Sequence, residues 1–221
     1  MIFHNKLPKS GSSTMNNLLK VLSKSNQFAY KKIEPTDLPN DLMSEESPVI
    51  NWIKANATGQ PFVLLKHHFP FDFTKHSLEQ PTYINVIRDP IDWFQSHYYF
   101  ERFGWEQVNG ARHFKGTEED KNMIIDDCVK NKHKQCVNVP WRYMEYFCGN
   151  GPECNPTTSG KPAQVAETTK LRMMTTFYVI GVLEQWENTL DLFQVINRFK
   201  QFFYFKLIFI HSSFINCSNV T

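Results

Sequence analysis

A lysine, a glycine and several hydroxyl residues lie together near the start of the chain and could bind an anion. Lys9 and Gly11 share this stretch with four hydroxyl residues, namely Ser10, Ser12, Ser13 and Thr14. An apolar stretch precedes them, and apolar residues recur at helical spacing over 15–22. A strand, a small-residue loop and a helix in this order direct backbone N–H groups at an anion, to which Lys9 would add a charge. By itself the stretch could also be a polar turn that caps a helix, and it lacks the GxxxxGK[ST] pattern of a Walker A loop.

Further polar side chains follow two later apolar runs. His67 comes after the run at 62–65, and Arg88 comes directly after the run at 83–87. Arg88 offers a planar fork for an anion, and Ser96 lies two helical turns beyond it, so we expect a second anion pocket there. His67 could remove a proton from a hydroxyl nucleophile. No carboxylate-rich cluster accompanies these residues, so we expect no metal ion and disfavour magnesium-dependent phosphoryl transfer by a small-metabolite kinase.

Alternating strands and helices must position these side chains. Apolar runs predict buried strands at the very start of the chain and at 62–65, 83–87 and 177–182, and helical spacing predicts helices over 49–57, 163–174 and 184–199. The segment 33–48 and the cysteine-bounded segments are expected to be largely loop. The alternation predicts an α/β fold, with a parallel, P-loop-like sheet flanked by helices. Ligands bind such sheets at the carboxyl ends of the strands, where Lys9, His67 and Arg88 all fall.

Composition limits the class of protein. The 221 residues are 41% hydrophobic and 21% charged, which indicates one globular domain with a full core. The formal charge of +2 does not indicate a nucleic-acid partner, so any polyanion site must be a local cluster. We find no signal peptide or membrane span, because the apolar run at 202–210 is too short and contains a lysine. Since the chain opens on a core strand, we expect a membrane anchor and stem upstream of this sequence.

Four of the five cysteines form two closely spaced pairs. Cys128 and Cys136 close one short loop, and Cys148 and Cys154 close another, as the disulfides of secreted proteins do. A zinc site is the alternative, but neither pair has C-x-x-C spacing. A glycosylation sequon at Asn56 is also consistent with a secretory lumen.

Four blocks of the sequence resemble the uronyl and heparan sulfate 2-O-sulfotransferases. The blocks occur in the family's order, at 8–14, at 83–90 with Ser96 eight positions after Arg88, at 98–104 and at 146–149. The first block is shared widely among sulfotransferases, whereas Ile-Asn-Val-Ile-Arg-Asp-Pro and Tyr-Phe-Cys-Gly are more specific. The resemblance covers roughly residues 1–199, and both cysteine spacings match the family's two disulfides.

The resemblance implies a sulfotransferase domain over residues 1–199. It also implies a Golgi type II membrane enzyme that uses 3′-phosphoadenosine 5′-phosphosulfate as co-substrate and no metal. Such an enzyme transfers sulfate to the 2-hydroxyl of a uronic acid in heparan, dermatan or chondroitin sulfate. Its partner is therefore a glycosaminoglycan, and a homo-oligomer is left open.

The same resemblance assigns roles to residues. Lys9 would stabilise charge on the sulfuryl oxygens while residues 10–14 wrap the 5′-phosphosulfate, and Arg88 with Ser96 would bind the 3′-phosphate. His67 would be the general base. In the heparan branch the base lies two positions before the one that His67 occupies, and this chain has a leucine there. His68, next to His67, is the second choice for the base. Lys6 and Arg112 lie where the family places cations for the acidic sugar, and we expect His68 and His97 to contact the sugar as well.

The C-terminal end departs from the family. After Phe199 an aromatic-rich tail, residues 200–221, replaces the family's continuation, so we expect a truncated C-terminal part. This leaves a second hypothesis, a truncated non-catalytic relative that binds sulfated glycan or pairs with an active subunit. Nucleotide binding would discriminate the two, because only an active enzyme must hold the donor.

Overall fold

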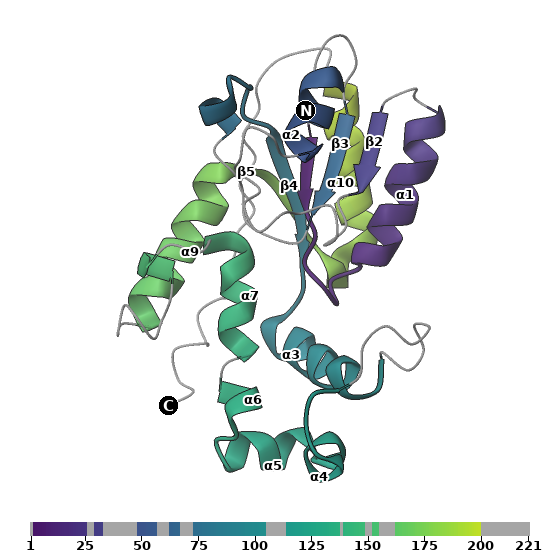
Figure 1. The fold of residues 1–221 in the computed structure, drawn as a ribbon. Coiled ribbons are helices and arrows are strands. Elements are labelled where there is room, and N and C mark those ends of the chain that lie inside the picture. The colour runs from purple at the N-terminus through teal and green to yellow at the C-terminus, as the bar shows by residue number, and fades with distance from the viewer. Residues whose placement is uncertain are drawn as a thin grey trace.

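The computed structural model describes residues 2–25, 29–32, 48–56, 62–66, 73–104, 114–137, 139–148, 152–154 and 162–199. Five parallel strands form one sheet in the order β2-β3-β1-β4-β5 (Figure 1). The strands are β1 (Ile2–Asn5), β2 (Ala29–Lys32), β3 (Phe62–Lys66), β4 (Thr82–Ile87) and β5 (Phe177–Val182). The parallel α/β sheet predicted from the sequence is confirmed.

β1 is the centre of the sheet and the point at which its winding reverses. β1 pairs with β3 on one side, where Asn5 lies opposite Lys66, and with β4 on the other, where His4 lies opposite Ile84. Loops that leave such a strand and its neighbours diverge, and ligands bind where they part. The loop after β1 and the residues after β4 therefore occupy the binding position of this fold.

Helices cover both faces of the sheet. On one face α1 (Ser12–Ser25) and α10 (Trp186–Phe199) pack on β1 and β4 through Met15, Leu19, Val86 and Trp186. On the other face α2 (Pro48–Asn56), α7 (Val139–Cys148) and α9 (Pro162–Thr176) contribute to the largest hydrophobic cluster, in which Phe3 and Phe177 represent the sheet. Within the described segments, no helix combines the length and the hydrophobicity that a bilayer crossing requires.

The remaining elements are short. Three are single 3₁₀ turns: η2 (Phe73–His76), η5 (Pro152–Cys154) and η6 (Leu183–Gln185). The others are α3 (Pro90–Tyr99), the π-helix η3 (Phe100–Gly104), α4 (Glu118–Asn122), α5 (Ile125–Lys130) and α6 (Lys134–Val137). Figure 1 shows α3 to α6 gathered beyond the carboxyl ends of the strands. This group of helices therefore lies on the ligand side of the sheet.

Two segments differ from the sequence-based expectation. β2 is a strand where the sequence predicts none, because Ala-Tyr-Lys-Lys lacks an apolar run and is half-buried at the edge of the sheet. The segment between Cys128 and Cys136 is expected to be a loop. In the structure it contains the end of α5, a turn at Lys132 and the start of α6. Helices this short depend on tertiary contacts rather than on propensity.

The buried guanidinium of Arg102 ties together the helices beyond the sheet. Its Nε donates to the Asp120 carbonyl at 3.2 Å, and its Nη2 donates to Gln135 Oε1 at 2.6 Å. Its Nη1 donates to the Tyr98 carbonyl at 3.3 Å, and the guanidinium carbon lies 3.4 Å from the centre of the Tyr98 ring. These contacts fix η3, which begins with Phe100, against α4 and α6. The Cys128–Cys136 disulfide, with an S–S distance of 2.09 Å, packs on Tyr98 in the same small core.

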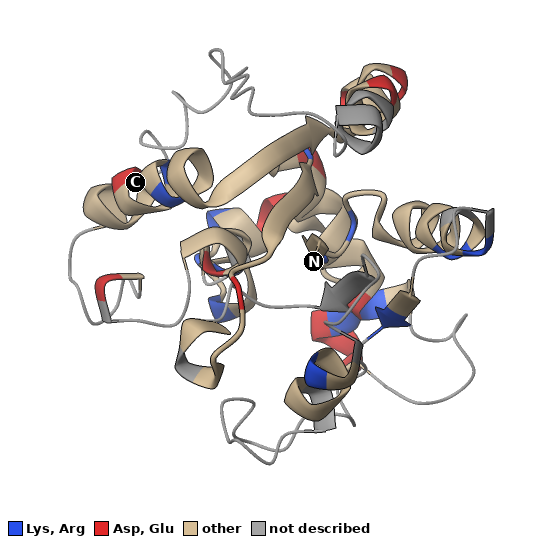
Figure 2. Cartoon of the chain, turned by 90° about the horizontal axis from the view of Figure 1, so that it is seen from above, with Lys and Arg blue, Asp and Glu red and all other residues tan. Residues whose placement is uncertain are grey.

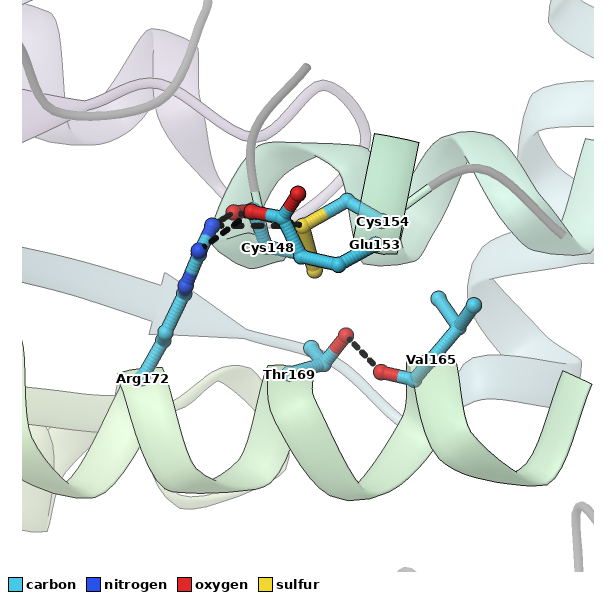
Figure 3. The surroundings of a disulfide bond; sticks show 6 residues. All are labelled: Cys148, Glu153, Cys154, Val165, Thr169 and Arg172. Carbon is cyan, nitrogen blue, oxygen red and sulfur yellow. Dashed lines mark hydrogen bonds and ion pairs between the residues drawn. A yellow bond between two sulfur atoms is a disulfide. The ribbon is translucent and has the colours of Figure 1, made fainter. Parts of the chain in front are cut away.

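The second expected disulfide closes the carboxyl end of α7. Cys148 and Cys154 are 2.07 Å apart at sulfur, and Arg172 of α9 reaches across to this loop (Figure 3). Arg172 donates to the Cys148 carbonyl and, at 2.6 Å, to Glu153 Oε1. The disulfide and the arginine together hold α7 against α9.

We predict that Arg102→Ala lowers the free energy of unfolding by roughly 2–4 kcal/mol, because three hydrogen bonds from a charged donor are lost and their buried or partly buried acceptors stay behind. Urea denaturation followed by circular dichroism measures the change. Lys130→Ala, which removes an exposed cation from α5, is the control and should change it by less than about 0.5 kcal/mol. Equal stability of the two variants would contradict the role assigned to Arg102.

Candidate anion-binding site

The loop between β1 and α1 is folded tightly by two left-handed residues. Lys9 has a φ of 62° and Gly11 a φ of 72°. The Gly11 carbonyl accepts the hydrogen bond from Met15 N at 2.9 Å and so starts α1. The left-handed conformation favours glycine at position 11, and a Cβ there would lie 2.9 Å from Leu183 Cδ1, so the leucine side chain would have to shift. Left-handed residues in a turn before a helix are typical of the backbone concavities that bind anions.

Ser10 is a buried hydroxyl within this loop. The residue is 2% exposed, and its Oγ has no hydrogen-bond partner among the described residues. A buried hydroxyl left unpaired costs about 1–3 kcal/mol, which a bound anion would offset by accepting a hydrogen bond from it. Ser12 is also buried, whereas Ser13 and Thr14 are exposed in the first turn of α1. The loop therefore has the donors for an anionic group, and at least one of them has no acceptor among the described residues.

The structure brings Lys9 and Arg88 together. Arg88 Nη1 donates to the Lys9 carbonyl at 3.4 Å, although the residues are far apart in sequence. Burial, and then the neighbouring Arg88 charge, lower the pKa of Lys9. Lys9 Nζ lies 4.1 Å from the centre of the Phe100 ring, so the aromatic face supports the ammonium on one side. The ends of β1 and β4 thus form one positively charged site.

Neighbouring elements hold the Arg88 segment in place. The Tyr143 hydroxyl of α7 donates to the Arg88 carbonyl at 2.9 Å. Asp89 caps α3, since its carboxylate accepts from the backbone N–H groups of Ile91 and Asp92, and Pro90 follows at the first helical position. Glu184 Oε1 of η6 accepts from Asp89 N at 3.0 Å and lies 3.9 Å from Arg88 Nε.

Sequence reasoning did not assign these supporting residues to the site. Trp93 Nε1 donates to the Pro8 carbonyl at 2.7 Å and so fixes the start of the anion-binding loop. Tyr143 and Glu184 come from segments 55 and more residues away from Arg88, and no local pattern marks them. Their roles depend on long-range packing, which periodicity and spacing do not report.

His97 lies buried on α3, near the positive charges of Arg142 and Lys9. Its ring stacks on Trp93, with ring centres 4.9 Å apart and an interplanar angle of 9°. Burial, and then the positive charges of Arg142 and Lys9, lower the pKa of His97 to about 4. Neither ring nitrogen has a hydrogen-bond partner among the described residues. The imidazole is therefore neutral near neutral pH and available for a hydrogen bond.

The other predicted site residues are only partly described. Ser96 is half-buried on α3, with no hydrogen bond to Arg88 within the described segments, and Lys6 is half-buried directly after β1. His67, His68 and Arg112 lie outside the described residues, as does the side chain of Asn56 at the end of α2. Their roles stay predictions. Figure 2 shows basic and acidic residues interspersed among the described elements.

Comparisons with known proteins agree with the geometry. A family model described as "Sulfotransferase family" matches residues 1–204. Human uronyl 2-sulfotransferase is 32% identical over 199 residues, which cover 87% of this chain and 47% of the relative. Heparan sulfate 2-O-sulfotransferase 1 of Gallus gallus is 31% identical over 200 residues, or 88% and 54% of the two chains. Heparin sulfate O-sulfotransferase of Drosophila melanogaster is 29% identical over 203 residues, or 88% and 55%. The chain spans about half the length of these relatives.

We predict that acid weakens the fold through His97. Its pKa is about 4 in the folded chain and near 6.5 when unfolded, so stability is full above about pH 6.5 and falls as pH drops toward 4. The slope approaches about 1.4 kcal/mol per pH unit, and His4, whose burial lowers its pKa to about 3, adds a similar loss. Urea denaturation at a series of pH values should show a shallower loss for His97→Gln than for the unchanged chain, and identical slopes would contradict the prediction.

Proposed function

The chain belongs to the sulfotransferase family, and we propose that it transfers a sulfuryl group from 3′-phosphoadenosine 5′-phosphosulfate to the 2-hydroxyl of a uronic acid in a glycosaminoglycan. The acceptor class follows the names of the relatives, which are uronyl and heparan sulfate 2-O-sulfotransferases. Heparan, dermatan and chondroitin sulfate all contain such a sugar. The observation that carries the proposal is the meeting of Lys9 and Arg88 at the ends of adjacent strands, joined by a 3.4 Å hydrogen bond.

The residues present fit a donor with two separate anionic groups. The β1–α1 loop offers the unpaired Ser10 hydroxyl, the helix N-terminus and the ammonium of Lys9 to the 5′-phosphosulfate. Arg88 and Ser96 would hold the 3′-phosphate from the end of β4 and from α3. The donor supplies an activated sulfuryl group, and the protein's task is to bind, orient and neutralise charge.

Charge stabilisation and proton removal fall to different residues. Lys9, with its pKa lowered by burial and by Arg88, would stabilise the negative charge that develops on the bridging and transferring oxygens. His67 would remove the proton from the acceptor hydroxyl, with His68 as the second choice. β3 ends at Lys66, opposite Asn5 of β1, so both histidines follow the strand beside the anion-binding loop. Positioning of the hydroxyl in line with the sulfuryl group would supply the rest of the rate.

Acceptor contacts would come from residues around this centre. Lys6 and Arg112 would pair with the carboxylate or sulfates of the polysaccharide, and His68 and His97 would add further contacts. Because His97 is neutral, with a pKa of about 4, we assign it a hydrogen bond to the sugar rather than an ion pair. A neutral donor is less sensitive to salt than a surface cation is.

We further propose that residues 1–199 form the sulfotransferase domain, followed by an atypical tail, and that the protein acts in the Golgi lumen. The two disulfides support an oxidising compartment, because such bonds are rare where thiols are kept reduced. Glycosylation at Asn56 and assembly into a homo-oligomer belong to the same proposal.

The proposal predicts that the chain transfers radiolabelled sulfate from the donor to desulfated heparin or to dermatan. Lys9→Ala and His67→Ala should each reduce transfer to background without changing the circular dichroism spectrum, since one removes charge stabilisation and the other the base. Binding of glycan without nucleotide binding would instead support a non-catalytic relative. Full transfer by a folded His67→Ala variant would assign the base to another residue.

Arg88→Ala should weaken binding of 3′-phosphoadenosine 5′-phosphate, the donor product, by roughly 10- to 100-fold. Charge-assisted hydrogen bonds to phosphate are worth about 1.5–3 kcal/mol, and the variant loses the guanidinium that makes them. Isothermal titration calorimetry measures the dissociation constant. Lys170→Ala, which removes a cation of α9 that pairs with Glu167, is the control and should leave it unchanged. An unchanged constant for Arg88→Ala would reject the 3′-phosphate pocket.

A further inference from the structure

The short connector after β5 contacts both segments of the anion-binding site. Leu183 packs against Gly11: its Cδ1 lies 2.9 Å from where a Cβ at position 11 would be. The next residue, Glu184, accepts a hydrogen bond from Asp89 N at 3.0 Å and lies 3.9 Å from Arg88 Nε. Two consecutive residues of η6 therefore meet the two segments that would bind the two ends of the donor.

The Arg88 guanidinium is oriented from two sides. Glu184 lies beside Nε, and Nη1 donates to the Lys9 carbonyl at 3.4 Å. Among the described residues, Nη2 has no hydrogen-bond or ion-pair partner, so this edge of the fork is the one left for a ligand. Tyr143 fixes the backbone of the same residue through its carbonyl. The guanidinium of Arg88 is thus held through Nε and Nη1.

The hydrogen bond from Asp89 N is the stronger of the two Glu184 contacts. The ion pair spans 3.9 Å between side chains that are 27% and 39% exposed, and pairs of this kind contribute little by themselves. The 3.0 Å hydrogen bond, in contrast, holds the residue that caps α3, and α3 carries Ser96. Glu184 therefore fixes the start of the helix as well as the arginine before it.

We propose that Glu184 is a positioning residue that makes the site selective for a 3′-phosphorylated nucleotide. The inference rests on the proposed function, in which Arg88 and Ser96 bind the 3′-phosphate. Glu184 does not touch the nucleotide in this assignment; it holds the two groups that do. Without its hydrogen bond, the Arg88–Asp89 peptide and the first turn of α3 lose a common anchor, and the two donors no longer converge on one phosphate.

Electrostatics makes this proposal sharply testable, because a carboxylate near a phosphate site also repels the phosphate. If Glu184 acted only through its charge, its removal would strengthen binding of the 3′-phosphate. If Glu184 positions Arg88 and α3, its removal weakens that binding. The two roles therefore predict opposite signs for the same substitution.

The test compares two nucleotides by isothermal titration calorimetry on the 221-residue chain. One is 3′-phosphoadenosine 5′-phosphate, and the other is adenosine 5′-phosphate, which lacks only the 3′-phosphate. We expect Glu184→Ala to weaken binding of the first by about 5- to 20-fold, less than the loss of Arg88 itself because the phosphate contacts are misaligned and not removed, and to leave the second unchanged. Glu184→Gln keeps an oxygen for Asp89 N and should stay within about threefold of the unchanged chain. Glu187→Ala, which removes an exposed carboxylate in the first turn of α10, is the matched charge control and should have no effect.

Glu184→Asp decides the matter if the alanine variant does not fold. It keeps the negative charge but withdraws the carboxylate by one methylene, so we expect a selective loss for 3′-phosphoadenosine 5′-phosphate. Tighter binding of that nucleotide by the alanine variant, an equal loss for both nucleotides, or an unchanged constant for the aspartate variant would each overturn the inference. An unchanged chain that fails to bind 3′-phosphoadenosine 5′-phosphate would overturn the proposed function as well, so the two failures are distinguishable.

Discussion

Two like charges held next to each other are the constraint on which this structure depends. Lys9 and Arg88 leave neighbouring strands at the same edge of the sheet, and the arginine donates to the lysine's own carbonyl at 3.4 Å. Burial, and then repulsion from the Arg88 charge, lower the pKa of Lys9. Such a pair is unfavourable until an anion lies between the charges, so the protein must hold it together by other means. The parallel sheet does so first, because it fixes both strand ends in one register.

The remaining supports come from elements far apart in the sequence. Tyr143 of α7 holds the Arg88 backbone, Trp93 of α3 holds Pro8, and Glu184 of η6 holds Asp89. These supports are themselves anchored: the Cys148–Cys154 disulfide and Arg172 fix the end of α7 (Figure 3), and Arg102 fixes the π-helix that begins with the Phe100 ring beneath Lys9. The disulfides and the buried arginine therefore stabilise the geometry of the site as much as the fold.

The sequence predicts the strand ends that carry the two cations, but not the residues that hold those strand ends in place, and the reason is physical. Long apolar runs mark β4 and β5 and thereby place Arg88 at a strand end, and short cysteine spacings predict both disulfides. The strand Ala29–Lys32 escapes prediction because it pairs on the edge through its backbone, without an apolar pattern. Tyr143 and Glu184 escape because a hydroxyl or a carboxylate gains its role only when tertiary packing brings it to the site. The roles of His67, His68 and Arg112 stay predictions, because these residues lie outside the described ones.

At Lys9, the left-handed backbone conformation lowers stability, while the side chain provides a positive charge. A side chain at a φ of 62° strains the backbone by about 1–2 kcal/mol, a strain that glycine would not have. Glycine, however, would remove the ammonium that faces Phe100 and Arg88. Selection for thermal stability alone would thus favour glycine in place of Lys9. A protein stabilised in that way would fold well but would lack the ammonium group at this position. At position 9 the chain therefore keeps an ammonium group and tolerates the backbone strain that comes with it.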